Sequence, residues 1–121
     1  MKNIVAALCV ALGLVGCTTP SSSLYSWGSY PQQNYLMYSQ PEKASPAAQI
    51  LKLEAEIERA KGKNLAVPPG LYAHLGLMYF QENQPAQAAE YFQLERQVYP
   101  ESTVMMDRLL KKMNVSAGQA K

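Results

Sequence analysis

The feature that most constrains the fold of this chain is residues 69–100, which have the apolar spacing of two short helices folded back on one another. The apolar residues are Leu71, Tyr72, Leu75, Met78 and Tyr79 in the first half and Ala88, Ala89, Phe92 and Tyr99 in the second. Between the halves, Asn83 and Gln84 suit a turn. Pro85 suits the first turn of a helix, because its missing N–H would have no partner there. The stretch therefore predicts a helical hairpin.

A single helix is predicted on each side of the hairpin. Ser45 is a plausible N-cap and Pro46 fits the first helical position, while Gly62 closes the helix. The apolar residues of this helix are Ala47, Ile50, Leu53 and Ile57, and those of the helix after the hairpin are Val104, Met105 or Met106, Leu109, Leu110 and Met113. The last helix is expected to end at Asn114 or just after it. The pattern thus predicts an all-α domain over residues 45–114 and a flexible tail over residues 115–121.

The hairpin resembles a tetratricopeptide repeat. With Pro69 as the first position, the characteristic small and aromatic positions fall on Tyr72, Leu75, Gly76, Tyr79, Ala88, Phe92 and Pro100. Glu95 stands where the repeat usually has a small residue, a departure that argues against close packing of the second helix on a following one. The resemblance implies a short tetratricopeptide-like array of one full hairpin plus flanking helices.

A second apolar strip on the first hairpin helix predicts a groove. In the repeat alignment Ala73, Leu77 and Phe80 fall on the concave face, where such repeats hold a ligand peptide or helix. Two occupants are considered: the chain's own helix around Ile50 and Ile57, or a helix or extended segment of a partner lipoprotein. The internal occupant is favoured, since exposed apolar patches are rare on stable monomers.

The N-terminal residues have the anatomy of a secretory signal. A charged start is followed by an apolar stretch over residues 4–15, which is too short to span a bilayer. The end of this stretch, Leu14-Val15-Gly16-Cys17, resembles the lipobox of bacterial lipoproteins. The resemblance implies that residues 1–16 are removed and that Cys17 receives acyl chains, which anchor the protein in the membrane. The residue after Cys17 is Thr18, whereas an aspartate at this position would resemble the signal that retains lipoproteins in the inner membrane. The location that the resemblance implies is therefore the outer membrane, with the protein facing the periplasm.

Residues 17–44 combine the acylated cysteine, a short tether and a segment rich in tyrosine and tryptophan. We expect the aromatic segment to be extended, with a possible helical turn from Tyr35 to Tyr38. Tyr25, Trp27 and Tyr30 are the candidate docking residues, and we expect them to pack on the helical domain, with Trp27 buried. The alternative is that these rings contact a partner, a sugar polymer or the membrane interface.

Charge and residue types argue against several functions. A net charge of +2 spread along the chain gives no basic face for nucleic acid. The single histidine, His74, has no nucleophile or acidic relay in a recognisable pattern. Glu54 and Glu58 lie one turn apart and could form a glycosidase pair, but we expect them, together with Glu56, on the solvated faces of their amphipathic helix. We therefore predict no enzyme activity and no cofactor, metal or small-molecule substrate.

A second resemblance covers nearly all the chain after Cys17. The run from Tyr25 to Tyr30, residues 67–73, and residues 99–102 with 106–109 together resemble a family of bacterial lipoproteins that share a domain of unknown function. The resemblance implies a periplasm-facing lipoprotein, often encoded beside a lipoprotein resembling the curli secretion channel. We therefore expect an interaction module for other envelope lipoproteins. The alternatives are a peptidoglycan-associated enzyme or enzyme activator, and a passive structural lipoprotein.

Overall fold

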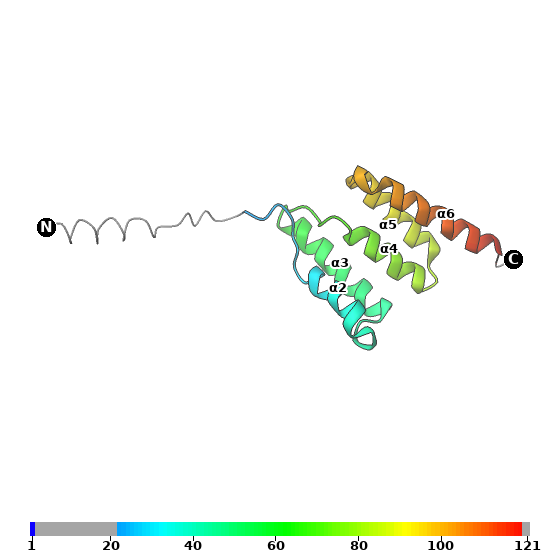
Figure 1. Cartoon of the computed structure of the whole chain (residues 1–121), viewed down its shortest axis with the longest axis horizontal. Coiled ribbons are helices and arrows are strands. Elements are labelled where there is room, and N and C mark those ends of the chain that lie inside the picture. The colour runs from blue at the N-terminus through cyan, green and yellow to red at the C-terminus, as the bar shows by residue number, and fades with distance from the viewer. Residues whose placement is uncertain (2–21, 120–121) are drawn as a thin grey trace.

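The computed structural model describes Met1 and residues 22–119, and its folded part is built from helices (Figure 1). The α-helices are α2 (Tyr30–Ser39), α3 (Pro46–Gly62), α4 (Leu71–Gln81), α5 (Pro85–Val98) and α6 (Thr103–Gln119), with short 3₁₀ helices η1 (Pro41–Lys43) and η2 (Pro100–Ser102). Residues 2–21, which include the rest of the predicted signal peptide and Cys17, lie outside the described residues. Among the described residues, no helix has the length and apolar character needed to cross a membrane.

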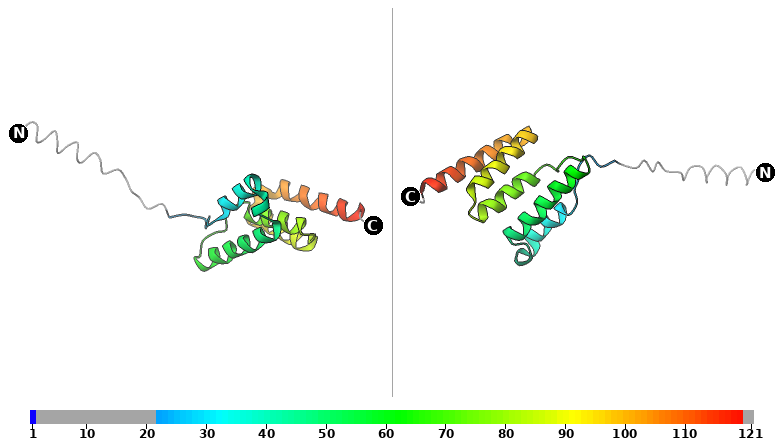
Figure 2. Two further views of the ribbon diagram at one scale, coloured as in Figure 1. Left: turned by 90° about the horizontal axis from the view of Figure 1, so that it is seen from below. Right: turned by 180° about the vertical axis from the view of Figure 1, so that it is seen from behind.

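Successive helices run antiparallel and lie side by side in chain order. The helix α4 contacts α3 on one flank and α5 on the other, and α6 packs on α5. The helix α2 packs on α3, which lies in front of it when the molecule is seen from behind (Figure 2, right). This arrangement confirms the predicted all-α array of one full hairpin with flanking helices.

The start of α3 has the predicted cap. The Ser45 hydroxyl oxygen accepts a hydrogen bond from the Ala48 N–H at 3.3 Å, and Pro46 occupies the first turn. Ile50, Leu53 and Ile57 form the buried face of this helix. The N-cap and the apolar spacing together thus fix the position of α3.

The turn of the hairpin also forms as predicted. Asn83 adopts a left-handed backbone conformation with φ 58°, and Pro85 begins α5. Within the hairpin, Gly76 allows α4 to approach α5 closely, because a Cβ at this position would lie 2.7 Å from a ring carbon of Phe92. The small residue that the repeat requires at Gly76 is therefore explained by this close packing.

Two clusters of buried apolar side chains hold the array together. The first cluster joins α2, α3 and α4 through Tyr30, Ile50, Leu53, Ile57, Ala60, Val67, Leu71, Tyr72, Leu75 and Met78. The second joins α4, α5 and α6 through Ala73, Ala88, Phe92, Met106 and Met113. The partly buried Leu77 and Tyr79 pack against both clusters. The central helix α4 therefore contributes to both clusters and connects them.

The packing of α6 on α5 corrects the expectation drawn from Glu95. Phe92 and Met106 are almost fully buried between the two helices, although Glu95 replaces a small residue. The Glu95 carboxylate is directed to the start of α4, where Oε1 accepts from the Gly70 N–H at 2.7 Å and Oε2 from the Ala73 N–H at 3.3 Å. The long side chain thus caps a neighbouring helix and does not prevent α6 from packing on α5.

The N-terminal segment is more ordered than the sequence predicted. Residues Tyr30–Ser39 form a ten-residue helix, α2, and not an extended segment with one turn. Pro31 lies in its first turn, and Tyr30 and Gln33 are its buried residues. Before α2, Tyr25 forms a parallel bridge with Ala66, in which the Ser26 N–H donates to the Ala66 carbonyl at 2.8 Å. At the other end of the chain, α6 extends to Gln119, past the predicted end at Asn114.

Candidate functional site

The face formed by α2, α4 and α6 carries a groove that follows α4, which we call the α4 groove. Its wider part has a volume of about 370 Å³ and is lined by residues of α2, α4 and α6 that include Met37, Tyr38, Ala73, Leu77, Met105 and Met106. Its second part, of about 270 Å³, is lined by Leu77, Phe80, Phe92, Leu109, Lys112 and Met113. Leu77 lines both parts, so the hollow runs along most of α4.

The three groove residues predicted from the sequence lie along the same helix face. Ala73 is buried in the second cluster and lines the wider part of the groove. Leu77 is half-buried, and Phe80 is 39% exposed where it lines the second part. Exposure therefore increases from Ala73 to Phe80.

The expected internal occupant of the groove is wrong. Ile50 and Ile57 of α3 pack in the first cluster with Leu71 and Leu75, on the flank of α4 that faces α3. The internal neighbour of Leu77 and Phe80 is α6, which supplies Leu109 and Met113 to one wall. The hollow between α6 and α2 remains unoccupied by any described segment.

The rim of the groove includes exposed apolar residues that sequence reasoning did not assign to it. Tyr38 of α2 is 81% exposed and Met105 of α6 is 59% exposed, and both line the wider part. Met37 lies beside Tyr38 and packs partly on the first cluster. A methionine side chain adapts its shape to different partners, so this rim suits an apolar binding surface. The sequence signal for Met105 was its place beside Met106 among the apolar residues of the last helix, where either methionine fitted the helical spacing.

His74 lines the groove but is held by internal contacts. Its Nε2 lies 2.8 Å from Gln49 Oε1, and Gln49 Nε2 donates to the Ala44 carbonyl at 2.7 Å. Because the Gln49 oxygen accepts, Nε2 carries a proton, and in the neutral ring Nδ1 is then unprotonated. Nδ1 is buried without a hydrogen-bond partner among the residues that the structure describes. Burial lowers the pKa of His74 from its ordinary value of 6.5, which favours the neutral ring.

The aromatic docking residues are only partly buried. Tyr30 is buried with its ring 5.9 Å from that of His74, so the segment does pack on the domain through this residue. The expected burial of Trp27 is wrong, because this side chain is 45% exposed and stacks on Tyr30 at a centroid distance of 6.5 Å. Tyr25 is half-buried and lies edge-on to Trp27 at 5.9 Å. The outer ring of this stack therefore remains accessible.

Glu56 fixes the aromatic segment to α3. The sequence placed this residue among the charged side chains of the outer faces, but its side chain is almost fully buried. Oε1 accepts from the Ser29 N–H at 3.0 Å and the Ser29 hydroxyl at 2.7 Å, and it pairs with Arg59 at 2.6 Å. Burial acts to raise the pKa of Glu56, but the hydrogen bonds from Ser29 and Arg59 outweigh it and the pKa is lowered. Gly28, in the left-handed conformation, leaves room for the carboxylate that a Cβ would block.

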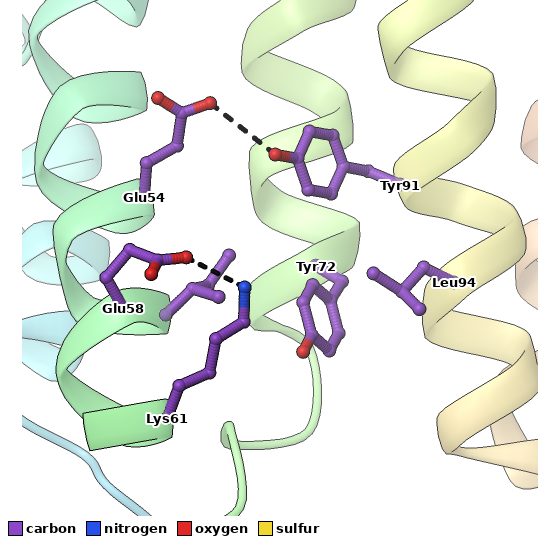
Figure 3. A pocket seen from close by; sticks show the side chains of 7 residues that line it. Glu54, Glu58, Lys61, Tyr72, Tyr91 and Leu94 are labelled. Carbon is purple, nitrogen blue, oxygen red and sulfur yellow. Dashed lines mark hydrogen bonds and ion pairs between the residues drawn. The ribbon is translucent and has the colours of Figure 1, made fainter. Parts of the chain in front are cut away.

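A second hollow, of about 360 Å³, lies between α3 and α5 and is shown in Figure 3. Glu54 projects from α3, and its Oε1 accepts from the Tyr91 hydroxyl at 3.5 Å (Figure 3). The same oxygen also accepts from the Tyr79 hydroxyl at 2.5 Å. The hydrogen bond to Glu54 raises the pKa of Tyr79. Glu58 is exposed, as expected, and pairs with Lys61 at 2.7 Å. Glu54 is therefore not a solvated carboxylate but a link from α3 to the two hairpin helices.

These partners leave neither carboxylate poised for acid–base chemistry. Glu54 is occupied by two tyrosine hydroxyls and Glu58 by an ammonium group. The rings of Tyr79 and Tyr91 stack at 5.5 Å, which further fixes their hydroxyls. Within the part of the chain that the structure describes, no group of three or more His, Cys, Asp or Glu residues is placed to hold a metal ion. The α4 groove is therefore the better candidate for a functional site.

Comparison with known proteins gives one match. The family model described as Domain of unknown function (DUF4810) matches residues 24–109, which is more than half of the chain. The matched range contains α2 to α5, the start of α6 and most of the α4 groove. No curated protein and no solved structure matches the sequence.

Proposed function

This chain belongs to the DUF4810 family, and we propose that it is a protein–protein interaction module of the bacterial envelope. Acyl chains on Cys17 hold it in the outer membrane, and the helical domain faces the periplasm. Its partner is another envelope lipoprotein, a choice supported by the resemblance to lipoproteins encoded beside a curli-secretion-channel-like lipoprotein.

The observation that carries this proposal is the α4 groove. Its floor is a helix whose other flanks are already covered by α3 and α5, so its open side is the remaining face. The exposed lining is apolar at Phe80 and Met105. Exposed apolar surface that follows a concave face is typical of a protein interaction site.

The occupant we propose is an amphipathic helix of the partner. The groove lies between two helices, α2 and α6, and follows a third, which is the shape that a helix fills with its apolar stripe. Methionines on the wall allow the surface to adapt to the apolar residues of that stripe. Because α6 already covers the buried side of the second cluster, the partner is not required for the hairpin to be packed.

A cross-linking pulldown from envelope extracts tests the groove. Phe80→Ser combined with Met105→Ser should abolish capture of the partner lipoprotein while the far-UV circular dichroism spectrum is retained, since neither side chain belongs to a buried cluster. Leu77 is left intact because it packs against both clusters. The matched control is Leu51→Ser, which removes a side chain that is 72% exposed on α3, outside the groove.

Two outcomes of this experiment, and one of a separate assay on purified sacculi, would oppose the proposal. A folded groove variant that keeps its partner would show that the groove is not the binding site. Absence of any specific cross-link for the native protein would favour a passive structural lipoprotein. Release of fragments from purified sacculi would favour a peptidoglycan-associated enzyme or enzyme activator.

Fractionation of a Cys17→Ser variant tests the anchor separately. We expect this protein to accumulate as an unprocessed precursor or as a soluble periplasmic protein, because stable attachment requires the acyl chains. A matured variant that remained in the outer membrane would mean that something other than lipid on Cys17 holds it there.

A further inference from the structure

An exposed aromatic patch lies where the chain enters the folded domain. Leu24 is 71% exposed and Trp27 is 45% exposed, with the half-buried Tyr25 between them in sequence. We call these three residues the aromatic end. Their backbone is fixed by the bridge to Ala66, and Trp27 rests on the buried Tyr30. The exposed Trp27 ring is therefore held in place by the fold.

We propose that the aromatic end sits in the phospholipid headgroup layer of the membrane to which the protein is anchored. This inference rests on the proposed acylation of Cys17. From Cys17 to Leu24 the chain advances by seven residues, a length of at most about 25 Å when fully extended. The aromatic end is thus the first part of the folded domain that follows the anchor, and it stays close to the bilayer.

The chemistry of the aromatic end suits this position. Tryptophan and tyrosine have an apolar ring with a polar group, and they are enriched where membranes meet water. Lys63 is exposed in the loop that follows α3, and this loop leads to Ala66, the bridge partner of Tyr25. A lysine in this loop is attracted to anionic headgroups, and its apolar stem can lie along an apolar surface.

The proposed position of the aromatic end in the headgroup layer leaves the α4 groove accessible. The helix α2 runs away from the point where the chain enters the domain, and Tyr38 on the groove rim lies in its last turn (Figure 1). A domain resting on its aromatic end therefore holds this part of the groove on the side away from the membrane surface. The membrane-contacting aromatic end and the partner-binding groove are then different parts of the same molecule.

Trp27 is the chain's single tryptophan, so its fluorescence reports on the aromatic end alone. The acylated full-length protein is reconstituted in vesicles of phosphatidylethanolamine and phosphatidylglycerol, with or without bromine on the upper acyl chain. We expect brominated lipid to quench Trp27, and we expect its emission to shift to shorter wavelength relative to the soluble Cys17→Ser protein. A Leu24→Ser substitution should weaken both effects.

A second reporter serves as the matched control. In a Trp27→Phe background, Tyr38→Trp places the only tryptophan at a position that is 81% exposed on the rim of the groove, and brominated lipid should quench it less than it quenches Trp27. An acylated protein that floats with the vesicles yet shows unchanged Trp27 emission would contradict the headgroup position of the aromatic end and leave the lipid anchor standing. A mature protein without lipid on Cys17, as seen by mass spectrometry, would contradict both the proposed acylation and the headgroup position of the aromatic end.

Discussion

At the scale of single residues, His74 makes the stability of the domain depend on pH. Its ring is buried, Nδ1 has no partner, and burial lowers its pKa from 6.5. The unfolded chain therefore binds a proton at a higher pH than the folded protein does. The contribution is fully present above pH 6.5 and is lost as the pH falls below this value. We expect the free energy of unfolding, measured by urea titration, to fall by at most about 1.4 kcal/mol per pH unit in this window.

A His74→Gln variant provides the control for this prediction. Its absolute stability is expected to be lower, but the slope just below pH 6.5 should disappear because no histidine is left to titrate. Glu56 also has a lowered pKa, but its ordinary value is 4.5, so its contribution is lost only in more acidic solution. Native protein whose stability is constant from pH 7.5 to pH 5 would contradict the assignment of a buried neutral ring.

Sequence reasoning assigned single charged residues less well than apolar ones. Helical spacing gave the buried residues Ile50 and Leu53 of α3, but it placed Glu56 among exposed residues. The reason is that the partner of Glu56 is Ser29, which is 27 positions away and belongs to another segment. Helix periodicity contains no information about such a contact. The prediction for Trp27 is wrong in the opposite direction. Its large aromatic ring predicted a buried side chain, but Trp27 is exposed and the neighbouring Tyr30 is buried.

At the scale of elements, Glu95 replaces the N-cap side chain that α4 lacks. The N-cap residue is Gly70, which offers no side-chain acceptor, and the Glu95 carboxylate accepts from the Gly70 and Ala73 N–H groups. Its negative charge also interacts favourably with the positive end of the helix dipole. Glu95→Ala should therefore lower the free energy of unfolding by about 2 kcal/mol or more, because buried donors lose their acceptor.

The variants Glu95→Gln and Glu90→Ala separate the cap from other effects. Glu95→Gln keeps an oxygen acceptor and should cost less than Glu95→Ala, since only the charge and one acceptor are lost. Glu90 is exposed on the same helix, so Glu90→Ala should change the stability by no more than about 0.5 kcal/mol. Thermal or urea unfolding of the three proteins decides the order. Equal losses for Glu95→Ala and Glu90→Ala would show that the cap contributes nothing.

Elements were predictable where an apolar stripe and a terminal signal coincided. The helices α3, α4 and α5 have both: α3 (Pro46–Gly62) begins and ends where its cap and glycine signals predicted, and α4 and α5 lie on either side of the predicted turn. The helix α2 lacks a stripe, because its buried residues are only Tyr30 and Gln33 while Tyr35 and Tyr38 are exposed. It was therefore expected to be extended. Asn114 likewise offered a possible end for α6, but an asparagine is tolerated within a helix and α6 continues to Gln119.

At the scale of the whole molecule, the array was predictable but the neighbours of α4 were only partly so. This helix is buried over most of its surface, from Leu71 to Gly76 and at Met78. Its sequence therefore marks several apolar faces without saying which helix covers each one. The choice of α3 as occupant of the groove failed for this reason, since α3 covers a different flank and α6 forms the groove wall. Ala73, Leu77 and Phe80 were assigned from the tetratricopeptide-like alignment, and all three side chains line the groove.

The sharing of α4 between two buried clusters predicts that the domain unfolds as one unit. Trp27 stacks on Tyr30 and so reports on the first cluster, whereas Met106 lies in the second. Met106→Ala should lower the free energy of unfolding by about 2–5 kcal/mol, as expected for a buried methionine. Since Leu77 and Tyr79 connect the clusters, this loss should be the same whether urea unfolding is followed by Trp27 fluorescence or by far-UV circular dichroism.

The matched variant Leu53→Ala removes a fully buried side chain from the first cluster. It should likewise shift both signals together, so that each variant shows one transition at a lower urea concentration. A Met106→Ala protein in which circular dichroism detects early loss of helix while the Trp27 transition stays at its native midpoint would contradict this prediction. In that case α5 and α6 would unfold separately from α2, α3 and α4, and the α4 groove would lose one wall before the rest of the domain unfolds.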